Sequence, residues 1–224
     1  MSVSNIAKVL IIDLDLSNIG SIYSAIQRAD PNAWIEVCAQ PGLVQHHPTH
    51  IILPGVGTFY EGSSRLKERL WSQYLTTILN SPNSSTYFLG ICLGMQLLAS
   101  NGSEGSHSNF SPGLNFIPSN VCSLHHNILN YQGTSTHIGW NTFSSIAHDC
   151  ALLTNVPSFA DFYYLHSYAF DLSSASPYVV ATSAFSDNIF PSIVSFNNIF
   201  GVQFHPEKSQ AFGHALFKNF LQLC

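Results

Sequence analysis

Residues 90–96 read GICLGMQ and join a strand-like run to a helix-like run. The run before them, Tyr87–Ile91, is apolar, whereas Leu93–Ala99 contains Leu, Met and Ala, which favour a helix. Cys92 therefore lies at a predicted strand-to-helix turn. The glycines on either side of it lack the β-carbons that would collide in a sharp turn.

A cysteine at such a turn is a candidate nucleophile. The turn resembles the nucleophile elbow, in which the reactive side chain stands clear of the sheet. A helix that begins at Cys92 would direct the positive end of its dipole at the sulfur and favour the thiolate, the form that attacks carbonyl carbon. The same residues also fit a buried apolar cysteine under a tight turn, and the motif is too short to separate the two interpretations.

Strand-like and helix-like segments alternate through the first hundred residues. Strands are predicted at Lys8–Asp13, Trp34–Cys38, His50–Leu53 and Tyr87–Ile91. Helices are predicted at Ile19–Asp30, capped by Ser17 or Asn18, and at Gly62–Leu79. This order predicts an α/β fold with a doubly wound, mostly parallel sheet and helices on both faces. Ligands bind at the carboxyl ends of such strands, where residues 54–57 (PGVG) and Cys92 both fall.

The second half of the chain predicts an antiparallel addition to this sheet. Asn101–Asn115 is rich in Ser, Gly and Asn and is expected to be an exposed loop. Short strand-like runs follow at Tyr163–His166, Val179–Ser183, Ile193–Phe196 and Ile199–Gln203, and a last helix at Gln210–Leu223. A chain of 224 residues is long enough for one well-buried core, and we find no linker or repeat, so we expect residues 1–224 to form a single domain.

The composition argues against several classes of protein. Charged residues make up 8% of the chain, against about 25% in typical soluble domains, and the net charge is −5. Without a basic cluster, we expect no nucleic-acid binding. No apolar run is long enough to span a bilayer and no leader-like segment begins the chain, so we expect a soluble protein with no membrane contact. Five cysteines without a CxxC pair suit the reducing cytoplasm rather than a disulfide framework or zinc knuckle.

The eleven histidines raise the question of a metal site. The groups His46, His47 and His50, and His125 and His126, have no HExxH frame and no neighbouring cysteine, so we expect surface residues and no metal.

His205 differs because it begins a His-Pro-Glu turn directly after a predicted strand. A cysteine nucleophile needs an imidazole to take and return its proton, and Glu207 is close enough in sequence to orient that imidazole. An ordinary exposed polar turn explains the same residues.

Taken together, the motifs resemble a known family. GICLGMQ and GVQFHPEKS (Gly201–Ser209) resemble the class I, triad-type glutamine amidotransferases, in which Cys, His and Glu occur in this chain order. Three further motifs narrow the resemblance to the glutaminase subunits of imidazole glycerol phosphate synthase: LPGVGTF (Leu53–Phe59), HIGWN (His137–Asn141) and YYLHSYAF (Tyr163–Phe170).

The resemblance implies a catalytic triad of Cys92, His205 and Glu207 that hydrolyses glutamine through a cysteinyl thioester, with no metal or organic cofactor. It implies oxyanion donors on the backbone of Leu93 and of the loop Gly55, Val56 and Gly57. It also implies that the ends of the substrate are held at Gly57, Gln96, Glu104, Ser167 and Tyr168.

The resemblance further implies a heterodimer. Ammonia would pass to a (β/α)8-barrel synthase subunit that makes imidazole glycerol phosphate in histidine biosynthesis. The residues matching the partner face or the ammonia passage are Asn18, His137, Trp140, Tyr163 and Lys208. Ordinary packing is the alternative explanation for each of them.

Some positions depart from the family pattern. The usual Asp-Tyr-Gly-x-Gly-Asn reads DLDLSN at residues 13–18, which places Asp15 at a glycine position. Thr136 replaces the proline before HIGWN, and residues 119–136 cannot be aligned. These changes also suit a paralogous subunit that supplies ammonia for sugar amination in bacterial surface polysaccharide synthesis. Two alternatives of other classes are a free-standing cysteine hydrolase and a silent binding subunit, although the intact Cys92, His205 and Glu207 argue against the silent subunit.

Overall fold

The computed structural model describes residues 6–81, 84–106, 109–124, 136–147 and 149–223. His125, His126 and Cys224 lie outside the described residues, as do residues 125–135 of the segment that could not be aligned.

The described residues form an eight-stranded central sheet in the order β2-β1-β3-β4-β14-β13-β12-β9. Its five parallel strands are β2 (Trp34–Cys38), β1 (Lys8–Ile12), β3 (His50–Gly55), β4 (Tyr87–Cys92) and β14 (Ile199–Val202). The antiparallel strands are β13 (Asn188–Phe196), β12 (Val179–Phe185) and β9 (Ser145–Ile146). The predicted α/β fold with an antiparallel addition is confirmed.

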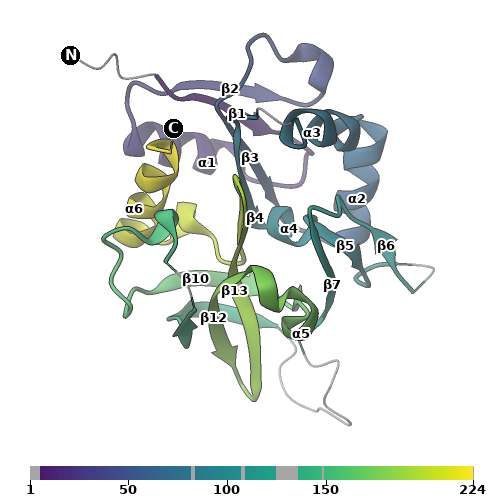
Figure 1. The fold of residues 1–224 in the computed structure, drawn as a ribbon, viewed down its shortest axis with the longest axis vertical. Coiled ribbons are helices and arrows are strands. Elements are labelled where there is room, and N and C mark those ends of the chain that lie inside the picture. The colour runs from purple at the N-terminus through teal and green to yellow at the C-terminus, as the bar shows by residue number, and fades with distance from the viewer. Residues whose placement is uncertain (1–5, 82–83, 107–108, 125–135, 148, 224) are drawn as a thin grey trace.

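Helices cover both faces of the parallel strands (Figure 1). The helices α1 (Ile19–Ala29) and α6 (Gln210–Leu221) lie together on one face. The other face carries α2 (Phe59–Glu68), α3 (Trp71–Leu79) and the short α4 (Leu93–Gln96).

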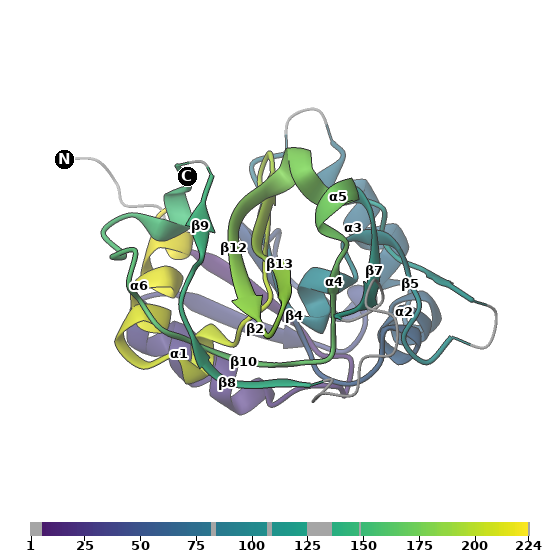
Figure 2. The ribbon, with the colours of Figure 1, turned by 90° about the horizontal axis from the view of Figure 1, so that it is seen from below.

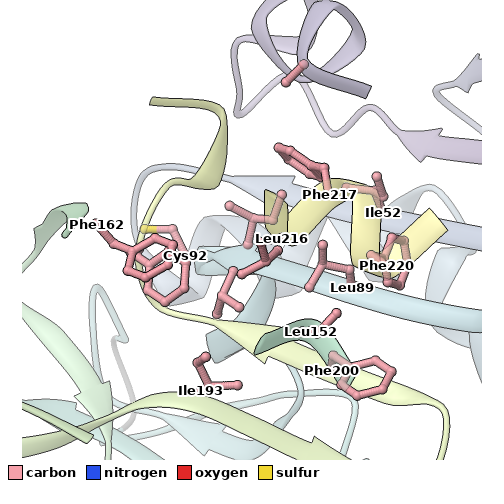
Figure 3. Packing of buried hydrophobic residues seen from close by; sticks show 14 of the residues in the cluster. Ile52, Leu89, Cys92, Leu152, Phe162, Ile193, Phe200, Leu216, Phe217 and Phe220 are labelled. Atoms are coloured by element: carbon pink, nitrogen blue, oxygen red, sulfur yellow. The ribbon is translucent and has the colours of Figure 1, made fainter. Parts of the chain in front are cut away.

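Two hydrophobic clusters result, one on each face, because successive residues of a strand point to opposite sides. Along β1, Val9 and Ile11 belong to the cluster under α1 and α6, whereas Leu10 and Ile12 belong to the cluster under α2 and α3. Figure 3 shows the first cluster with Cys92 beside Phe162 at its margin. The core therefore reaches the end of β4, where the candidate nucleophile lies.

Two smaller sheets complete the described part of the chain. One contains β11 (Tyr168–Phe170), β7 (Ile117–Ser123), β5 (Ala99–Gly102) and β6 (Ser111–Pro112), with the short α5 (Leu172–Ala175) following β11. The other pairs β8 (His137–Asn141) with β10 (Phe162–His166) in antiparallel register. Figure 2 shows β8 and β10 running side by side, apart from the β12–β13 hairpin. We call this pair the β8–β10 ribbon.

Two helix predictions are wrong in extent. The single helix Gly62–Leu79 is two helices, because Leu70 takes a left-handed φ of 65° between them. The first of these begins earlier than predicted, at Phe59, where a capping box joins Thr58 and Glu61. The helix predicted at Leu93–Ala99 ends at Gln96.

Three further predictions are wrong because distant partners decide the outcome. The expected loop Asn101–Asn115 includes the end of β5 and all of β6, since β5 pairs with β7 and β6 pairs with β5. Tyr163–His166 joins β8 rather than the central sheet. His50 is buried rather than on the surface, because its ring stacks on Tyr87 and meets the edge of Phe220.

Candidate active site

Cys92 occupies a strained turn where β4 meets α4. Its φ is 53° and its ψ is −109°, a backbone conformation that non-glycine residues rarely adopt. A β-carbon at Gly94 would overlap the carbonyl oxygen of Leu53, so the turn requires glycine there. The predicted strand-to-helix elbow is confirmed. Because α4 has only four residues, the helix dipole is a smaller part of the site than the sequence argument assumed.

His205 and Glu207 form a buried pair beside this turn. His205 Nδ1 lies 2.8 Å from Glu207 Oε1, and their side chains are 3% and 7% exposed. The turn is held in place because the Ser209 hydroxyl donates to the carbonyl oxygen of His205 at 2.6 Å, and the His205 amide donates to that of Tyr163 at 2.8 Å. The alternative of an exposed polar turn does not fit this burial.

The charges around His205 favour its protonated form. Burial lowers the pKa of His205. The charge and hydrogen-bonding capacity of the Cys92 side chain, followed by those of the Glu207 carboxylate, outweigh burial and raise this pKa to about 10. The interaction of His205 with the Cys92 side chain is longer or less well aligned than an ordinary hydrogen bond, since His205 Nε2 has no partner of ordinary length and angle among the described residues. Nε2 is thus the nitrogen left to transfer a proton, and such contacts are often long before substrate binds.

A cavity of about 130 Å³ adjoins Cys92. It is lined by Val56, Gly57, Cys92, Leu93, Gln96, Glu104, Leu165, His166, Ser167 and Tyr168. The structure therefore brings together the predicted substrate-binding residues except Gly55. Leu165 and His166 were missed, although both lie inside the YYLHSYAF motif.

Two side chains give this cavity its chemistry. Burial raises the pKa of Glu104 to about 7; the Phe59 backbone acts against this shift and the Glu61 charge adds to it. A cation bound beside Glu104 would restore its negative charge, which suits a ligand with an ammonium group. The amide nitrogen of Gln96 donates to Tyr168 O at 2.8 Å and to Gln203 Oε1 at 3.2 Å.

The loop of Gly55, Val56 and Gly57 closes one side of the site. Gly55 packs closely on Leu93, and Gly57 has a φ of 106°, which favours glycine. The Val56 amide donates to Leu16 O at 2.6 Å. In this conformation the Val56 N–H is engaged by Leu16 and is not available as an oxyanion donor, which departs from the sequence expectation.

The loop that carries Leu16 is anchored by an ion pair. Asp15 takes a φ of 58°, so an aspartate adopts a left-handed conformation at the position of a family glycine. Its carboxylate pairs with Arg69 and lies 3.7 Å from Arg65. Arg69 Nη1 also donates to the carbonyl oxygen of Asp13 at 2.8 Å. The charge introduced at Asp15 is therefore neutralised within the chain.

The residues expected at a partner face divide into two groups. On the β8–β10 ribbon, Trp140 faces Tyr163, and the neighbouring pair of Ile138 and Leu165 was missed by the sequence analysis. Trp140 is 49% exposed and Ile138 61% exposed. Lys208 Nζ lies 5.6 Å from the centre of the Tyr163 ring.

The other two predicted interface residues make contacts within the chain. Asn18 caps α1 by accepting a hydrogen bond from the amide of Ser21. His137 is buried and stacks against Tyr164 and Phe185, which is ordinary packing. A place at an interface stays a prediction for these two residues.

The described residues show neither a metal centre nor a membrane span. They contain no group of three or more His, Cys, Asp or Glu side chains that could hold a metal ion. Within the same residues, no helix combines the length and apolar character needed to cross a membrane. Four cysteines of the described chain are free thiols: Cys38, Cys92, Cys122 and Cys150.

Comparison with known proteins places this geometry in a family. Residues 10–223 match the family model described as glutamine amidotransferase class-I. The chain is 39% identical to imidazole glycerol phosphate synthase subunit HisH 1 of Prochlorococcus marinus, over 97% of this chain and 98% of the relative. It is 36% identical to subunit HisH 2 of that synthase from Methanococcus maripaludis, over 96% of this chain and 98% of the relative.

Solved structures share the fold at low sequence identity. PurLQS of Thermotoga maritima superposes with a TM-score of 0.69 at 14% identity, covering 97% of this chain and 98% of that one. A glutamine amidotransferase of the same organism gives a TM-score of 0.57 at 21% identity, covering 91% of this chain and 77% of that one. At these identities the likeness concerns the fold alone.

Proposed function

Because the chain belongs to the class I glutamine amidotransferases, and among them to the glutaminase subunits of imidazole glycerol phosphate synthase, we propose that Cys92, His205 and Glu207 release ammonia from glutamine for a synthase partner. The observation that carries the proposal is the position of Cys92, which lines a small cavity and interacts with the buried His205–Glu207 pair.

The reaction proceeds in two halves. The Cys92 sulfur attacks the side-chain amide carbon of glutamine, which forms a C–S bond and a tetrahedral oxyanion near the Leu93 amide. His205 then gives its proton to the amide nitrogen, the C–N bond breaks and ammonia leaves. In the second half, His205 takes a proton from water, which attacks the γ-glutamyl thioester and releases glutamate and the Cys92 sulfur. Atoms and charge balance with no cofactor.

The cavity supports glutamine as the substrate. Glu104 provides a carboxylate for the α-amino group, and Ser167, between β10 and β11, lines the same cavity with its hydroxyl 2.7 Å from that of Thr136. Both donor hydrogens of the Gln96 amide are used within the chain, which leaves only its oxygen to accept from substrate.

The β8–β10 ribbon supports a protein partner that receives the ammonia. Aromatic and aliphatic side chains gather on its outward face, and such residues anchor protein interfaces. We propose a (β/α)8-barrel synthase subunit in a heterodimer, with histidine biosynthesis as the pathway, because the relatives that match carry that synthase's name.

One observation favours a second acceptor. The loop of residues 13–18 has lost the family's glycines, and its Asp15 is tied to Arg69. A docking surface that has changed in this way would also suit a paralogue that serves a sugar-pathway partner. We further propose that residues 1–224 act as one domain in the cytoplasm, where reducing conditions keep the thiol of Cys92 free.

The test measures glutamate release from glutamine by the chain alone, with its barrel partner, and with the partner and its ribulosyl ligand. Cys92→Ala is the blank, and Cys122→Ala is the matched control because Cys122 is a half-buried thiol that does not line the cavity of the described residues. We expect a large rise only when partner and ligand are both present, in the wild type and in Cys122→Ala.

Each of the other outcomes supports one of the alternative functions. A rise with a sugar-pathway partner and none with the ribulosyl ligand moves the chain to the second acceptor. Activity that no partner changes indicates a free-standing cysteine hydrolase, and silence in every condition indicates a binding subunit.

A further inference from the structure

A buried glutamine that does not line the described cavity contacts the sulfur of Cys92. Gln203 directly follows β14 and is completely buried. Its Nε2 lies 3.8 Å from Cys92 Sγ, within hydrogen-bond distance for sulfur. Gln203 is absent from the described residues that line the substrate cavity, so its contact with the nucleophile does not depend on substrate.

The orientation of this amide is fixed by its neighbours. The Gln96 Nε2 group uses its two hydrogens on Tyr168 O and on Gln203 Oε1. Because Gln203 must present its oxygen to this donor, its NH₂ group is turned toward the sulfur. The Gln203 amide therefore presents its donor, and not its oxygen, to Cys92 Sγ. The carbonyl oxygen of Leu165, which can only accept, lies 3.7 Å from the same sulfur.

The same line of hydrogen bonds continues away from Gln96. His166 Nδ1 lies 2.9 Å from Tyr168 O, which can only accept, so this nitrogen carries the hydrogen. His166 Nε2 then accepts from His137 Nδ1 at 3.1 Å. Asn141 Nδ2 lies 3.3 Å from His137 Nε2 and so completes the line by donating to it.

Both histidines stay neutral in this arrangement. Burial lowers the pKa of His137 to about 4. Burial also lowers the pKa of His166 to about 3, and the nearby His137 and His205 act in the same direction against the carbonyl of Tyr168. Each ring can therefore donate at one nitrogen and accept at the other, as the line requires.

We propose that Gln203 stabilises the thiolate of Cys92 by donating an N–H hydrogen bond to its sulfur, and that Gln96 fixes the amide in this orientation. The inference rests on the proposed function, because a thiolate is needed only if Cys92 is the nucleophile. Hydrogen bonds to charged groups are the stronger kind, so the loss of this donor has a measurable effect on reactivity.

The experiment measures the rate at which iodoacetamide alkylates Cys92 in the purified full chain. Mass spectrometry of the Cys92 peptide monitors the reaction at pH values from 5 to 10. Gln203→Leu removes the donor at similar volume, and Gln203→Glu keeps the shape but places an oxygen against the sulfur. Thr86→Val is the control for losing a buried hydrogen bond, since Thr86 is buried at the opposite end of β4. Cys122 is the reference thiol within each sample.

We expect Gln203→Leu to slow alkylation of Cys92 at pH 7 by roughly ten-fold and to move the pH dependence upward by about one unit. Gln203→Glu slows alkylation of Cys92 at least as much. The alkylation rate of Cys92 in Thr86→Val, and that of Cys122 in every variant, stays at the wild-type value. A Cys92 profile in Gln203→Glu that superimposes on wild type overturns the proposal, even if Gln203→Leu fails to fold.

This readout separates the inference from the proposed function. Alkylation needs neither glutamine nor a partner, so a chain that shows the expected Gln203 dependence but releases no glutamate in any condition keeps the inference and loses the function. If glutamate release depends on the partner but the Gln203 variants leave the alkylation profile of Cys92 unchanged, the proposed function stands and the inference is lost.

Discussion

Glu207 shows how one side chain sets the charge of another. The carboxylate lies 2.8 Å from Nδ1 of His205 and accepts the hydrogen of that nitrogen, so the hydrogen on Nε2 is the one that can be transferred. Burial alone would keep the imidazole neutral. The charges of Cys92 and Glu207 overcome that effect and raise the pKa of His205 to about 10.

Glu207→Gln removes one of these charges at nearly constant shape. We expect kcat for glutamate release in the partner complex to fall roughly 10⁴-fold, as when the orienting carboxylate is removed from comparable triads. The pKa of His205 should fall as well, which a pH titration of its ring signals by NMR measures. Glu68→Gln, on the exposed end of α2, is the matched control. A kcat within three-fold of wild type would contradict the role of Glu207.

Sequence predicted the residues whose neighbours are close in the chain. The Cys92 turn and the His205–Glu207 pair follow from spacings of a few residues, and the structure brings them together. The Gln203 contact could not be predicted, because it depends on β14 lying beside β4, which are more than a hundred residues apart in the chain.

At the scale of elements, β3, β4 and α4 meet at one point of backbone contact. Gly94 lies against the carbonyl oxygen of Leu53, and Gly55 on the same strand packs against Leu93. Backbone cannot move aside as the end of a flexible side chain can, so this contact tolerates no added atom.

Gly94→Ala should therefore destabilise the fold by roughly 3 kcal/mol or more and displace Cys92. Gly42→Ala is the control, because a β-carbon there meets nothing within 4 Å. Urea unfolding of both variants measures the difference, and glutamate release reports the position of the nucleophile. Equal stabilities for the two variants would show that the β3–α4 contact can relax.

Element boundaries were predicted where caps and periodicity are local. Asn18, one of the two predicted caps, is the cap of α1, and the strands of the parallel sheet fall close to their predicted ranges. The failures came from residues whose conformation is set elsewhere. Leu70 breaks a helical pattern through its left-handed backbone, and β5 forms because it pairs with β7 on one side and β6 on the other.

For the molecule as a whole, buried histidines link stability to pH. Burial lowers the pKa of His50 to about 4, against opposing contributions from the backbone at Phe220 and Leu223, and it lowers the pKa values of His137 and His166 as well. The unfolded chain binds these protons near pH 6.5, whereas the folded chain does not until the pH falls further. Stability is therefore lost as the pH falls from about 6.5 toward 4.

Glu104 acts in the opposite direction over part of this range. Burial raises its pKa to about 7, so the folded chain takes up this proton before the unfolded chain does and gains stability as the pH falls from about 7 toward 4.5. The net slope for wild type is thus a difference between several groups, and a single histidine is best measured by a comparison of variants.

His50→Leu isolates one histidine, because His50 lies at the start of β3, at the end of the sheet opposite Cys92. Wild type should lose roughly 2 kcal/mol more than this variant between pH 7.5 and pH 5, since the unfolded state gains the proton of His50 and the folded state does not. Urea unfolding at the two pH values measures it. His47→Gln, at an exposed histidine three residues earlier, is the control, and its free energy of unfolding should change between the two pH values by as much as that of wild type. If His50→Leu does the same, the buried imidazole of His50 is already protonated at pH 5, and the packing of Tyr87 and Phe220 around it does not exclude the charge.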